Sequence, residues 1–335
     1  MLDVCLLGTG GMVPLPNRWL TSLWVRYEGK GLLIDCGEGT QITMRELGWS
    51  FKDVDHILFT HFHGDHISGL PGLLLSIGNC GRTEPVTLIG PRGLRRICEG
   101  LLLIAPELPF ALEYRELGRE DLGVPMKLGE LSVTAFAADH GVPCYGYALE
   151  AARLPKFDPE RARAAGVPLC YWNPLQHGET VTAEDGTVYT PDLVLGAARK
   201  GLKLSYCTDS RPKKTIVEGV RGSDLFICEG MYGEPEKQEK AKEHKHMSFR
   251  EAAEMAAEAG VGELWLTHFS PAEPNPKAYL SEATAIFPNS FCGKDRKTVT
   301  LRFSDEEVPA EEADAQAEAD EMPAEIPGMT VQEDN

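Results

Sequence analysis

The sequence lacks the features that would tie it to a membrane or to an oxidising compartment. It has no run of about 18 apolar residues, so we expect no membrane-spanning helix. Residues 1–8 carry no basic segment and are too short for a signal peptide. The nine cysteines are scattered and form no CxxC pair, which fits reduced thiols better than a disulfide framework. We therefore expect a cytoplasmic protein without a membrane partner.

Positive charge is also scarce, and it is absent from the last tenth of the chain. The 335 residues include 33 Lys and Arg against 51 Asp and Glu, a formal charge of −18. Residues 304–335 hold twelve of the acidic residues and no basic one, so residues 1–303 carry only −6. A charge of −18 argues against a nucleic-acid partner, but most of this imbalance belongs to the tail. We expect a domain of residues 1–303 followed by a disordered acidic tail over 304–335.

Short apolar segments ended by Gly, Asp or His recur along the chain and predict strands. They are residues 2–7, 22–27, 31–34, 54–59, 86–89, 131–135, 145–149, 202–207, 225–228, 263–267 and 298–303. Helical patterns lie between some of them, over 39–47, 67–77, 93–103 and 248–259. In the last pattern Glu251 stands three residues after Ser248, and Gly260 ends it, as in a capped helix. Strands interleaved with helices predict an α/β protein whose sheets are covered by helices.

Residues 153–200 break this alternation, because they are rich in Pro, Gly and charge and hold only weak periodicity. An irregular segment of this length in a compact domain is usually functional or forms a protruding substructure. Its aromatic residues Phe157, Tyr171 and Trp172 could stack on nucleobases or pack the segment onto its own stem. We treat this segment as an inserted arm.

The most informative motif is His61-Phe-His63-Gly-Asp65-His66, which directly follows a predicted strand. His61 and His63 are two residues apart and can point to the same side. The glycine lets the chain turn, so that Asp65 and His66 face a second position. Imidazole and carboxylate groups bind Zn²⁺ and also suit Mn²⁺ or Fe²⁺. Two such metals about 3.5–4 Å apart would form a clamp for hydrolysis.

Three further candidate ligands, His140, Asp209 and His268, each stand just past a predicted strand. Active sites gather at the carboxyl ends of strands in α/β folds. Taken alone, His140 or His268 would more often be a structural histidine. Together with the first motif, the set favours a site for two metals.

This set resembles the metal ligands of the metallo-β-lactamase superfamily. The resemblance implies an αββα sandwich with a dinuclear metal site at one edge. The residues that it assigns are, for one metal, His61, His63 and His140, for the other Asp65, His66 and His268, and for the bridge between them Asp209.

Other segments resemble the ribonuclease Z family within that superfamily. They are Leu-Gly-Thr-Gly-Gly-Met-Val-Pro over 7–14, Asp-Cys-Gly-Glu-Gly-Thr-Gln over 35–41, Phe-Thr-His-Phe-His-Gly-Asp-His-Ile-Ser-Gly-Leu-Pro-Gly over 59–72, and the segments 246–253 and 266–270. That family removes the 3′ trailer of precursor tRNA and leaves a 3′-hydroxyl on the tRNA. The resemblance covers residues 1–303 and implies a homodimeric endoribonuclease with two Zn²⁺ ions and an arm that binds the tRNA.

The same resemblance assigns roles in the reaction. Asp65 would orient and deprotonate the attacking water. His246, with Glu229 behind it, would stabilise the charged phosphorane and protonate the leaving 3′ oxygen.

The chain departs from the family in the loop that senses the CCA end of tRNA. The usual Pro-x-Lys-x-Arg-Asn reads Pro-Leu-Pro-Asn-Arg-Trp over 14–19, so the Lys and the final Asn are absent while Arg18 remains. Arg211 and Lys213, just after a predicted metal ligand, could meet RNA phosphates, although such charges more often lie on a solvated face. Arg18, Arg211 and Lys213 are therefore the candidate substrate-binding residues.

The sequence leaves two other hypotheses open. The first is a small-molecule phosphodiesterase or arylsulfatase with the same fold and ligands, in which the arm is reduced to a lid. The altered loop over 14–19 favours it somewhat. The second is a non-catalytic RNA-binding or scaffold protein, against which the complete ligand set counts.

Overall fold

The computed structural model describes residues 1–304, which divide into two compact units. The first combines Met1–Ala152 with Gly201–Arg302, and the second contains Arg153–Lys200. The acidic tail expected over 304–335 lies outside the described residues, apart from Ser304.

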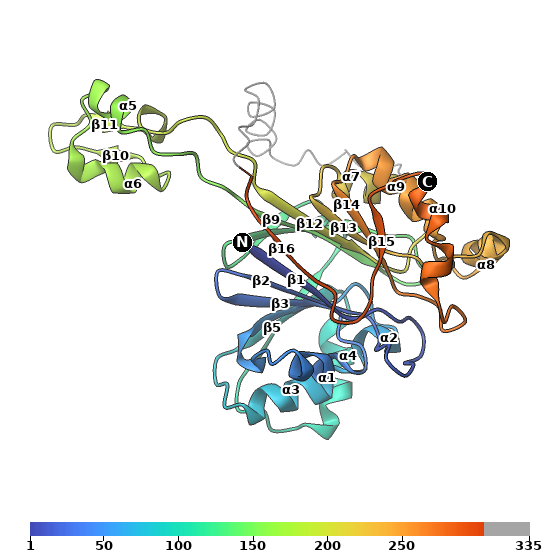
Figure 1. Cartoon of the computed structure of the whole chain (residues 1–335). Coiled ribbons are helices and arrows are strands. Elements are labelled where there is room, and N and C mark those ends of the chain that lie inside the picture. Colours follow the sequence, from blue (N-terminus) through green and yellow to red (C-terminus); the bar gives the residue numbers. More distant parts are fainter. Residues whose placement is uncertain (305–335) are drawn as a thin grey trace, which may run out of the picture. The chain divides into compact units, whose positions relative to one another are not determined.

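One sheet of the first unit has seven strands and joins both ends of the described chain (Figure 1). Its order is β16 (Thr298–Leu301), β1 (Leu2–Gly8), β2 (Ser22–Tyr27), β3 (Lys30–Ile34), β4 (Val54–Leu58), β5 (Val86–Pro91) and β6 (Leu112–Leu117). The strands from β16 to β3 pair antiparallel, and those from β3 to β6 pair parallel. Because β4 is hydrogen-bonded on both sides, its apolar run Ile57-Leu58 is fully buried.

The other sheet of this unit also has seven strands. Its order is β15 (Ser290–Cys292), β14 (Glu263–Thr267), β13 (Leu225–Glu229), β12 (Leu202–Cys207), β9 (Tyr145–Ala151), β8 (Leu131–Ala137) and β7 (Pro125–Leu128). The strands from β15 to β12 are parallel, and those from β12 to β7 are antiparallel.

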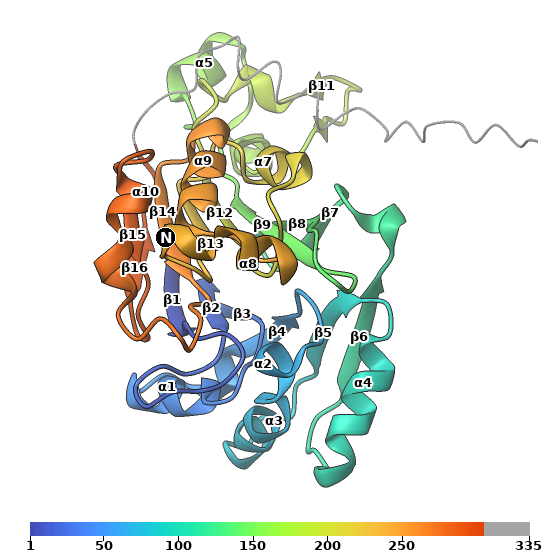
Figure 2. The same cartoon turned by 90° about the vertical axis from the view of Figure 1, so that its right-hand side faces the viewer.

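Helices cover the outer face of each sheet, which confirms the αββα architecture (Figures 1 and 2). Those beside the first sheet are α1 (Thr40–Glu46), α2 (Gly64–Ile67), α3 (Leu70–Asn79) and α4 (Leu94–Leu101), with short 3₁₀ turns at Phe51–Asp53, Leu102–Ile104 and Arg119–Asp121. Those beside the second are α7 (Lys214–Val220), α8 (Gln238–Glu243), α9 (Phe249–Ala259) and α10 (Ser281–Thr284), with 3₁₀ turns at Pro235–Lys237 and Pro276–Tyr279. Each layer of helices shares an apolar core with its sheet.

The two sheets are hydrogen-bonded to each other beside the histidine motif. The Tyr147 hydroxyl on β9 donates to the carbonyl of Phe59 at 2.7 Å, and the Tyr145 amide donates to the carbonyl of Thr60 at 3.0 Å. Phe59 and Thr60 are the residues that lead from β4 into the motif. Tyr147 is fully buried, so this contact fixes where the first sheet delivers the motif relative to the second.

The predicted helix over 248–259 is confirmed with its caps. The Ser248 hydroxyl accepts the Glu251 amide at 3.3 Å, and the Glu251 carboxylate accepts the Ser248 amide at 3.0 Å. This capping box satisfies two amides that the first turn would otherwise leave unpaired. Gly260 ends the helix in the left-handed conformation, at φ +62°.

The single helix predicted over 67–77 is wrong, because the structure holds two helices, α2 and α3. Gly69 separates them and donates its amide to the carbonyl of Cys36 at 2.9 Å. A Cβ on Gly69 would lie 2.2 Å from the carbonyl oxygen of Gly37, so only glycine permits this approach. The sequence analysis also missed β6, β7 and β15, whose segments are short or alternate with charged residues.

The second unit has a small core of its own. Its elements are α5 (Pro159–Ala164), α6 (Trp172–Gln176), β10 (Val181–Thr182), β11 (Val188–Tyr189) and 3₁₀ turns at Leu169–Tyr171 and Pro191–Leu193. The rings of Phe157 and Trp172 pack at 5.0 Å between centroids, and the Trp172 indole donates to the carbonyl of Val167 at 2.9 Å. Phe157, Tyr171 and Trp172 are partly buried and pack against this small core, and their stacking on nucleobases stays a prediction.

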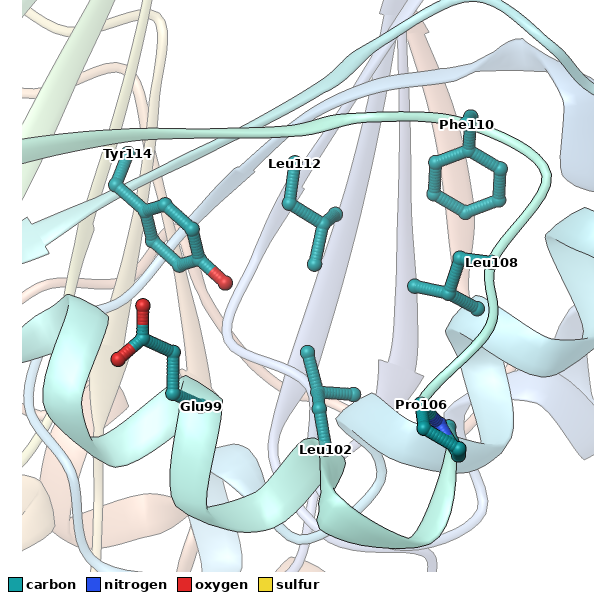
Figure 3. Close-up of a pocket in the computed structure, with 8 residues that line it drawn as sticks. Glu99, Leu102, Pro106, Leu108, Phe110, Leu112 and Tyr114 are labelled. Carbon is teal, nitrogen blue, oxygen red and sulfur yellow. The ribbon is translucent and has the colours of Figure 1, made fainter.

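A pocket of about 320 Å³ lies beside α4 and β6 (Figure 3). Leu108, Phe110 and Leu112 line one side, and Glu99 faces Tyr114 at the other end. No histidine or cysteine lines it, so it is separate from the candidate metal ligands. Within the described residues, no helix is long and apolar enough to cross a membrane.

Candidate metal centre and active site

The predicted metal ligands lie at the ends of four strands that meet at one edge of the two sheets. The motif follows β4, with Asp65 and His66 in the first turn of α2. His140 lies three residues past β8, Asp209 two residues past β12, and His268 directly past β14. The structure brings all seven side chains together, in groups whose ligand atoms lie within 4.8 Å of one another.

His61, His63 and His140 form one group. The Nε2 atom of His140 lies 3.2 Å from Nδ1 of His63. The ring centroid of His61 lies 4.6 Å from that of His63 and 5.1 Å from that of His140. Three imidazoles therefore converge from two different sheets.

Asp65, His66 and His268 form a second group. The Nε2 atoms of His66 and His268 are 3.3 Å apart, and Nε2 of His268 lies 3.3 Å from Oδ2 of Asp65. The amide of Met12 donates to the same oxygen at 2.7 Å. A Cβ on the neighbouring Gly11 would lie 2.6 Å from the His268 ring, so glycine is required where this loop crosses the site.

Asp209 lies between the two groups. Its Oδ2 is 3.1 Å from Nε2 of His66 and 3.2 Å from Nε2 of His268. Its Oδ1 is 3.9 Å from Nε2 of His140 and 4.0 Å from Nε2 of His61. One carboxylate oxygen thus faces each group, as a bridging ligand would require.

Partners behind the rings fix which nitrogen faces the centre. Nδ1 of His66 donates to Oδ2 of Asp35 at 2.9 Å, and Nδ1 of His140 donates to the carbonyl of Lys245 at 3.2 Å. Nδ1 of His61 lies 3.1 Å from the Thr60 hydroxyl, which donates to Asp35. With Nδ1 engaged in this way, each of these rings turns Nε2 toward the site, and this nitrogen binds a metal once it carries no proton.

Asp35 is a functional residue that the sequence analysis did not assign. It is fully buried, and its carboxylate accepts the Thr60 amide at 2.8 Å besides the Thr60 hydroxyl and Nδ1 of His66. The segment 35–41 carried the family resemblance, but nothing local to it shows that its carboxylate reaches His66, 31 residues away.

Three residues of the site hold backbone conformations that are uncommon for residues with a side chain. The φ angle is +62° at Asp35, +50° at Asp209 and +55° at His268. Each lies just past a strand, where the turn directs its side chain into the cluster. Such conformations cost on the order of 1 kcal/mol each and persist where the surroundings enforce them.

The electrostatics of the cluster favour a cation. Burial raises the pKa of Asp209, but the neighbouring His268, His66 and His61 rings outweigh it and hold that pKa well below its usual value. Burial disfavours charge on His66, but Asp209 and Asp35 raise its pKa well above the usual value. Burial lowers the pKa of His61, which therefore stays neutral.

The donor set fits a divalent metal. By themselves, the residues leave some buried polar atoms unpaired. Nε2 of His61 and Oδ2 of Asp209 are buried and form no hydrogen bond. An unsatisfied buried polar atom costs about 1–3 kcal/mol, so a partner is expected here. Imidazole nitrogens and carboxylate oxygens at these separations suit Zn²⁺, Mn²⁺ or Fe²⁺. The protein is therefore a metal-binding one.

His246 and Glu229 form a buried pair beside the cluster. Nδ1 of His246 lies 2.9 Å from Oε2 of Glu229 and 3.7 Å from Oδ1 of Asp209. Burial lowers the pKa of His246, but Glu229 outweighs it and raises that pKa to about 9. The ring stacks on that of His268 at 5.6 Å between centroids. A charged donor is thus held beside the candidate metal ligands.

The three candidate substrate-binding residues lie in different environments. Arg18 donates to the carbonyls of Glu273 at 2.8 Å and Pro274 at 3.0 Å. Arg211 is bonded to Glu251, whereas Lys213 is exposed at the start of α7. The two arginines thus have partners within the chain, and contacts of all three with RNA stay predictions.

Comparisons with known proteins agree with this fold. The family model described as Beta-lactamase superfamily domain matches residues 156–269, and that described as Anti-Pycsar protein Apyc1 matches residues 2–98. The ribonuclease Z of Lachnoclostridium phytofermentans is 57% identical over 307 residues, which are 92% of this chain and 100% of that protein. The ribonuclease Z of Lachnospira eligens is 56% identical over 306 residues, 91% of this chain and 100% of that protein.

Solved structures share the fold at lower identity. The short form of human tRNase Z matches with a TM-score of 0.63 and 23% identity, over 90% of this chain and 100% of that one. The metallo-β-lactamase fold protein YhfI of Bacillus subtilis matches with a TM-score of 0.63 and 18% identity, over 89% of this chain and 98% of that one. These likenesses support the sandwich described above.

The first testable prediction concerns the carboxylate behind His66. Asp35→Asn should weaken zinc binding about 10–100-fold, because the amide no longer holds the ring with a negative charge. Competition with a coloured chelator measures this affinity. Asp3→Asn, which changes a half-exposed carboxylate paired with Arg26, is the matched control and should leave zinc affinity unchanged. Equal affinity in Asp35→Asn and the wild type would contradict the role given to Asp35.

Proposed function

Because the chain belongs to the ribonuclease Z family, we propose that it is an endoribonuclease that removes the 3′ trailer of precursor tRNA and leaves a 3′-hydroxyl on the tRNA. The observation that carries this proposal is the convergence of seven metal-ligand side chains beside the His246–Glu229 pair. The chain covers the full length of relatives that bear the family name, and these relatives do not favour the small-molecule esterase alternative.

In this proposal the metals are two Zn²⁺ ions, with Mn²⁺ or Fe²⁺ as other ions that the donor set suits. His61, His63 and His140 would hold one ion, and Asp65, His66 and His268 the other, with Asp209 shared. When bound, such ions supply positive charge to the scissile phosphate and lower the pKa of water.

Asp65 is the residue proposed to orient the attacking water. Its Oδ2 accepts the Met12 amide and faces His268, so the orientation of its carboxylate is fixed before substrate binds. A carboxylate held in this way can orient a water molecule and accept its proton as the oxygen adds to phosphorus.

His246 serves the leaving group. Because Glu229 engages Nδ1, the opposite nitrogen, Nε2, is the one that can donate a proton. As the bond between phosphorus and the 3′ oxygen breaks, a proton from His246 would neutralise that oxygen and give the 3′-hydroxyl. The Glu229 carboxylate stabilises the charged ring before the transfer.

The arm over 153–200 is proposed as a part that binds the tRNA. Over 150–200 it holds six Lys and Arg against seven Asp and Glu, so bulk positive charge does not explain its binding. Hydrogen bonds and shape would carry more of the recognition. The proposed organisation is a catalytic domain of residues 1–303 with this arm inserted, followed by an acidic tail over 304–335.

We also propose a homodimer, as the family resemblance implies, and a cytoplasmic location. All nine cysteines lie in the described residues and are free thiols, which supports a reducing compartment. Precursor tRNA, the proposed substrate, would be the principal partner.

A second prediction tests the metal chemistry. Chelation should abolish cleavage of a precursor tRNA, and added Zn²⁺ should restore it, because the ligands alone supply no Lewis acid. His63→Ala and Asp65→Ala should each lower kcat at least about 1,000-fold and not be rescued by Zn²⁺ at ordinary concentrations. His56→Gln is the control, since His56 lies on β4 away from the cluster. Cleavage by His63→Ala at the wild-type rate would refute the mechanism.

A third prediction separates an RNA enzyme from a small-molecule esterase. Leu202 on β12 pairs with Ala151 on β9, so a short Gly-Ser linker can replace residues 155–197 without moving either strand. Cleavage of precursor tRNA should fall at least about 100-fold in kcat/KM, while hydrolysis of bis(4-nitrophenyl) phosphate should change less than about 3-fold. Undiminished tRNA cleavage would show that the arm does not bind the substrate.

A further inference from the structure

We propose that Arg211 and Glu251 are positioning residues that fix the catalytic histidine, His246, through its backbone. The inference rests on the proposed function, because it assigns the pair to the same reaction. Arg211 was expected to meet RNA phosphates. The contacts that its guanidinium makes inside the chain support a different role.

Arg211 and Glu251 form a two-point ion pair. Nη1 of Arg211 donates to Oε2 of Glu251 at 3.0 Å, and Nη2 donates to Oε1. The side chains are only 17% and 13% exposed. A planar guanidinium that meets a carboxylate at both oxygens fixes direction as well as distance, which a lysine could not do.

The same guanidinium holds the backbone of His246. Nη1 of Arg211 also donates to the carbonyl oxygen of His246. The amide of His246 donates to the carbonyl of Ala241 at 2.8 Å. Both backbone polar groups of His246 are therefore held, and the Arg211 bond is the one made by a side chain.

Glu251 anchors the pair to α9. Its carboxylate accepts the Ser248 amide at 3.0 Å while it accepts the Arg211 guanidinium. The first turn of α9 begins three residues after His246. The carboxylate thus ties the rigid helix to the loop that carries the catalytic histidine.

Arg211 also connects this loop to the bridging ligand. Asp209, Ser210 and Arg211 are consecutive, and the Ser210 amide donates to Oε1 of Glu229 at 2.5 Å. The other oxygen of Glu229 holds the His246 ring. Three adjacent residues therefore place a metal ligand, orient the partner of His246, and hold the His246 carbonyl.

These contacts favour positioning over phosphate binding. A phosphate would have to displace Glu251 from a largely buried pair, leaving that carboxylate without its counter-charge, and such losses are costly. Lys213, two residues on, is exposed and could meet a phosphate without this loss. Arg211 is therefore assigned to the protein's own active site.

The test uses two conservative variants. Arg211→Lys keeps the positive charge but loses the planar guanidinium that meets both carboxylate oxygens. Glu251→Gln keeps the helix cap, since Gln also serves in a capping box. Each should lower kcat for precursor tRNA about 10–100-fold with KM changed less than about 3-fold, because a reacting group is misplaced while substrate contacts remain. Bound metal and thermal midpoint should stay close to the wild type in both.

A double-mutant cycle decides whether the pair acts through His246. Added to His246→Ala, either variant should lower kcat by less than about 3-fold more, because the histidine that the pair positions is gone. Hydrogen exchange of the metal-free protein gives a readout independent of activity: backbone amides over 244–248 should exchange faster in Arg211→Lys. Arg250→Lys and Glu254→Gln alter an exposed ion pair on α9 and are the matched controls, with no expected effect.

Two outcomes would overturn the inference. Losses that multiply with His246→Ala would show that Arg211 acts independently of the histidine. Two results together would show that Arg211 contacts RNA phosphate. KM would rise with kcat unchanged, and the slope of the logarithm of the binding constant against the logarithm of salt concentration would become shallower by about one. A wild-type protein inactive on precursor tRNA would instead refute the proposed function, and the exchange measurement would still test the positioning.

Discussion

The buried carboxylate of Asp209 is the constraint on which the active site depends. It is 2% exposed, it lies within 3.2 Å of two imidazole nitrogens, and one of its oxygens forms no hydrogen bond. Such a group is stable only beside positive charge. The fold supplies the surroundings by stacking two sheets so that the ends of β4, β8, β12 and β14 meet at it. The strained backbone at Asp209 and His268 is part of the same arrangement.

Much of the fold could be predicted, because its strands are short apolar runs and its best helix carries its own caps. Strands 22–27, 202–207 and 263–267 were predicted to the residue, and so was the end of α9 at Gly260. The errors have local causes. The break between α2 and α3 depends on Gly69 approaching the distant Gly37 backbone, and β6 alternates apolar with charged residues at a sheet edge.

The site shows the same division between local and long-range information. The HxHxDH motif is a local pattern, and the histidines and aspartate past later strands follow from the rule that strand ends gather. Asp35 and Glu251 were not assigned because each acts on a residue 31 or 40 positions away, across different elements. Arg211 is of a residue type that often contacts RNA, yet its guanidinium faces Glu251. Only the pairing of side chains in three dimensions reveals that.

The most direct test of the account is the location of bound metal. Crystals grown with zinc, measured on either side of the zinc absorption edge, would place each ion by its anomalous signal. We expect two ions, one among His61, His63 and His140 and one among Asp65, His66 and His268, with an Asp209 oxygen on each. A single ion, or ions that leave Asp209 without a metal contact, would contradict it.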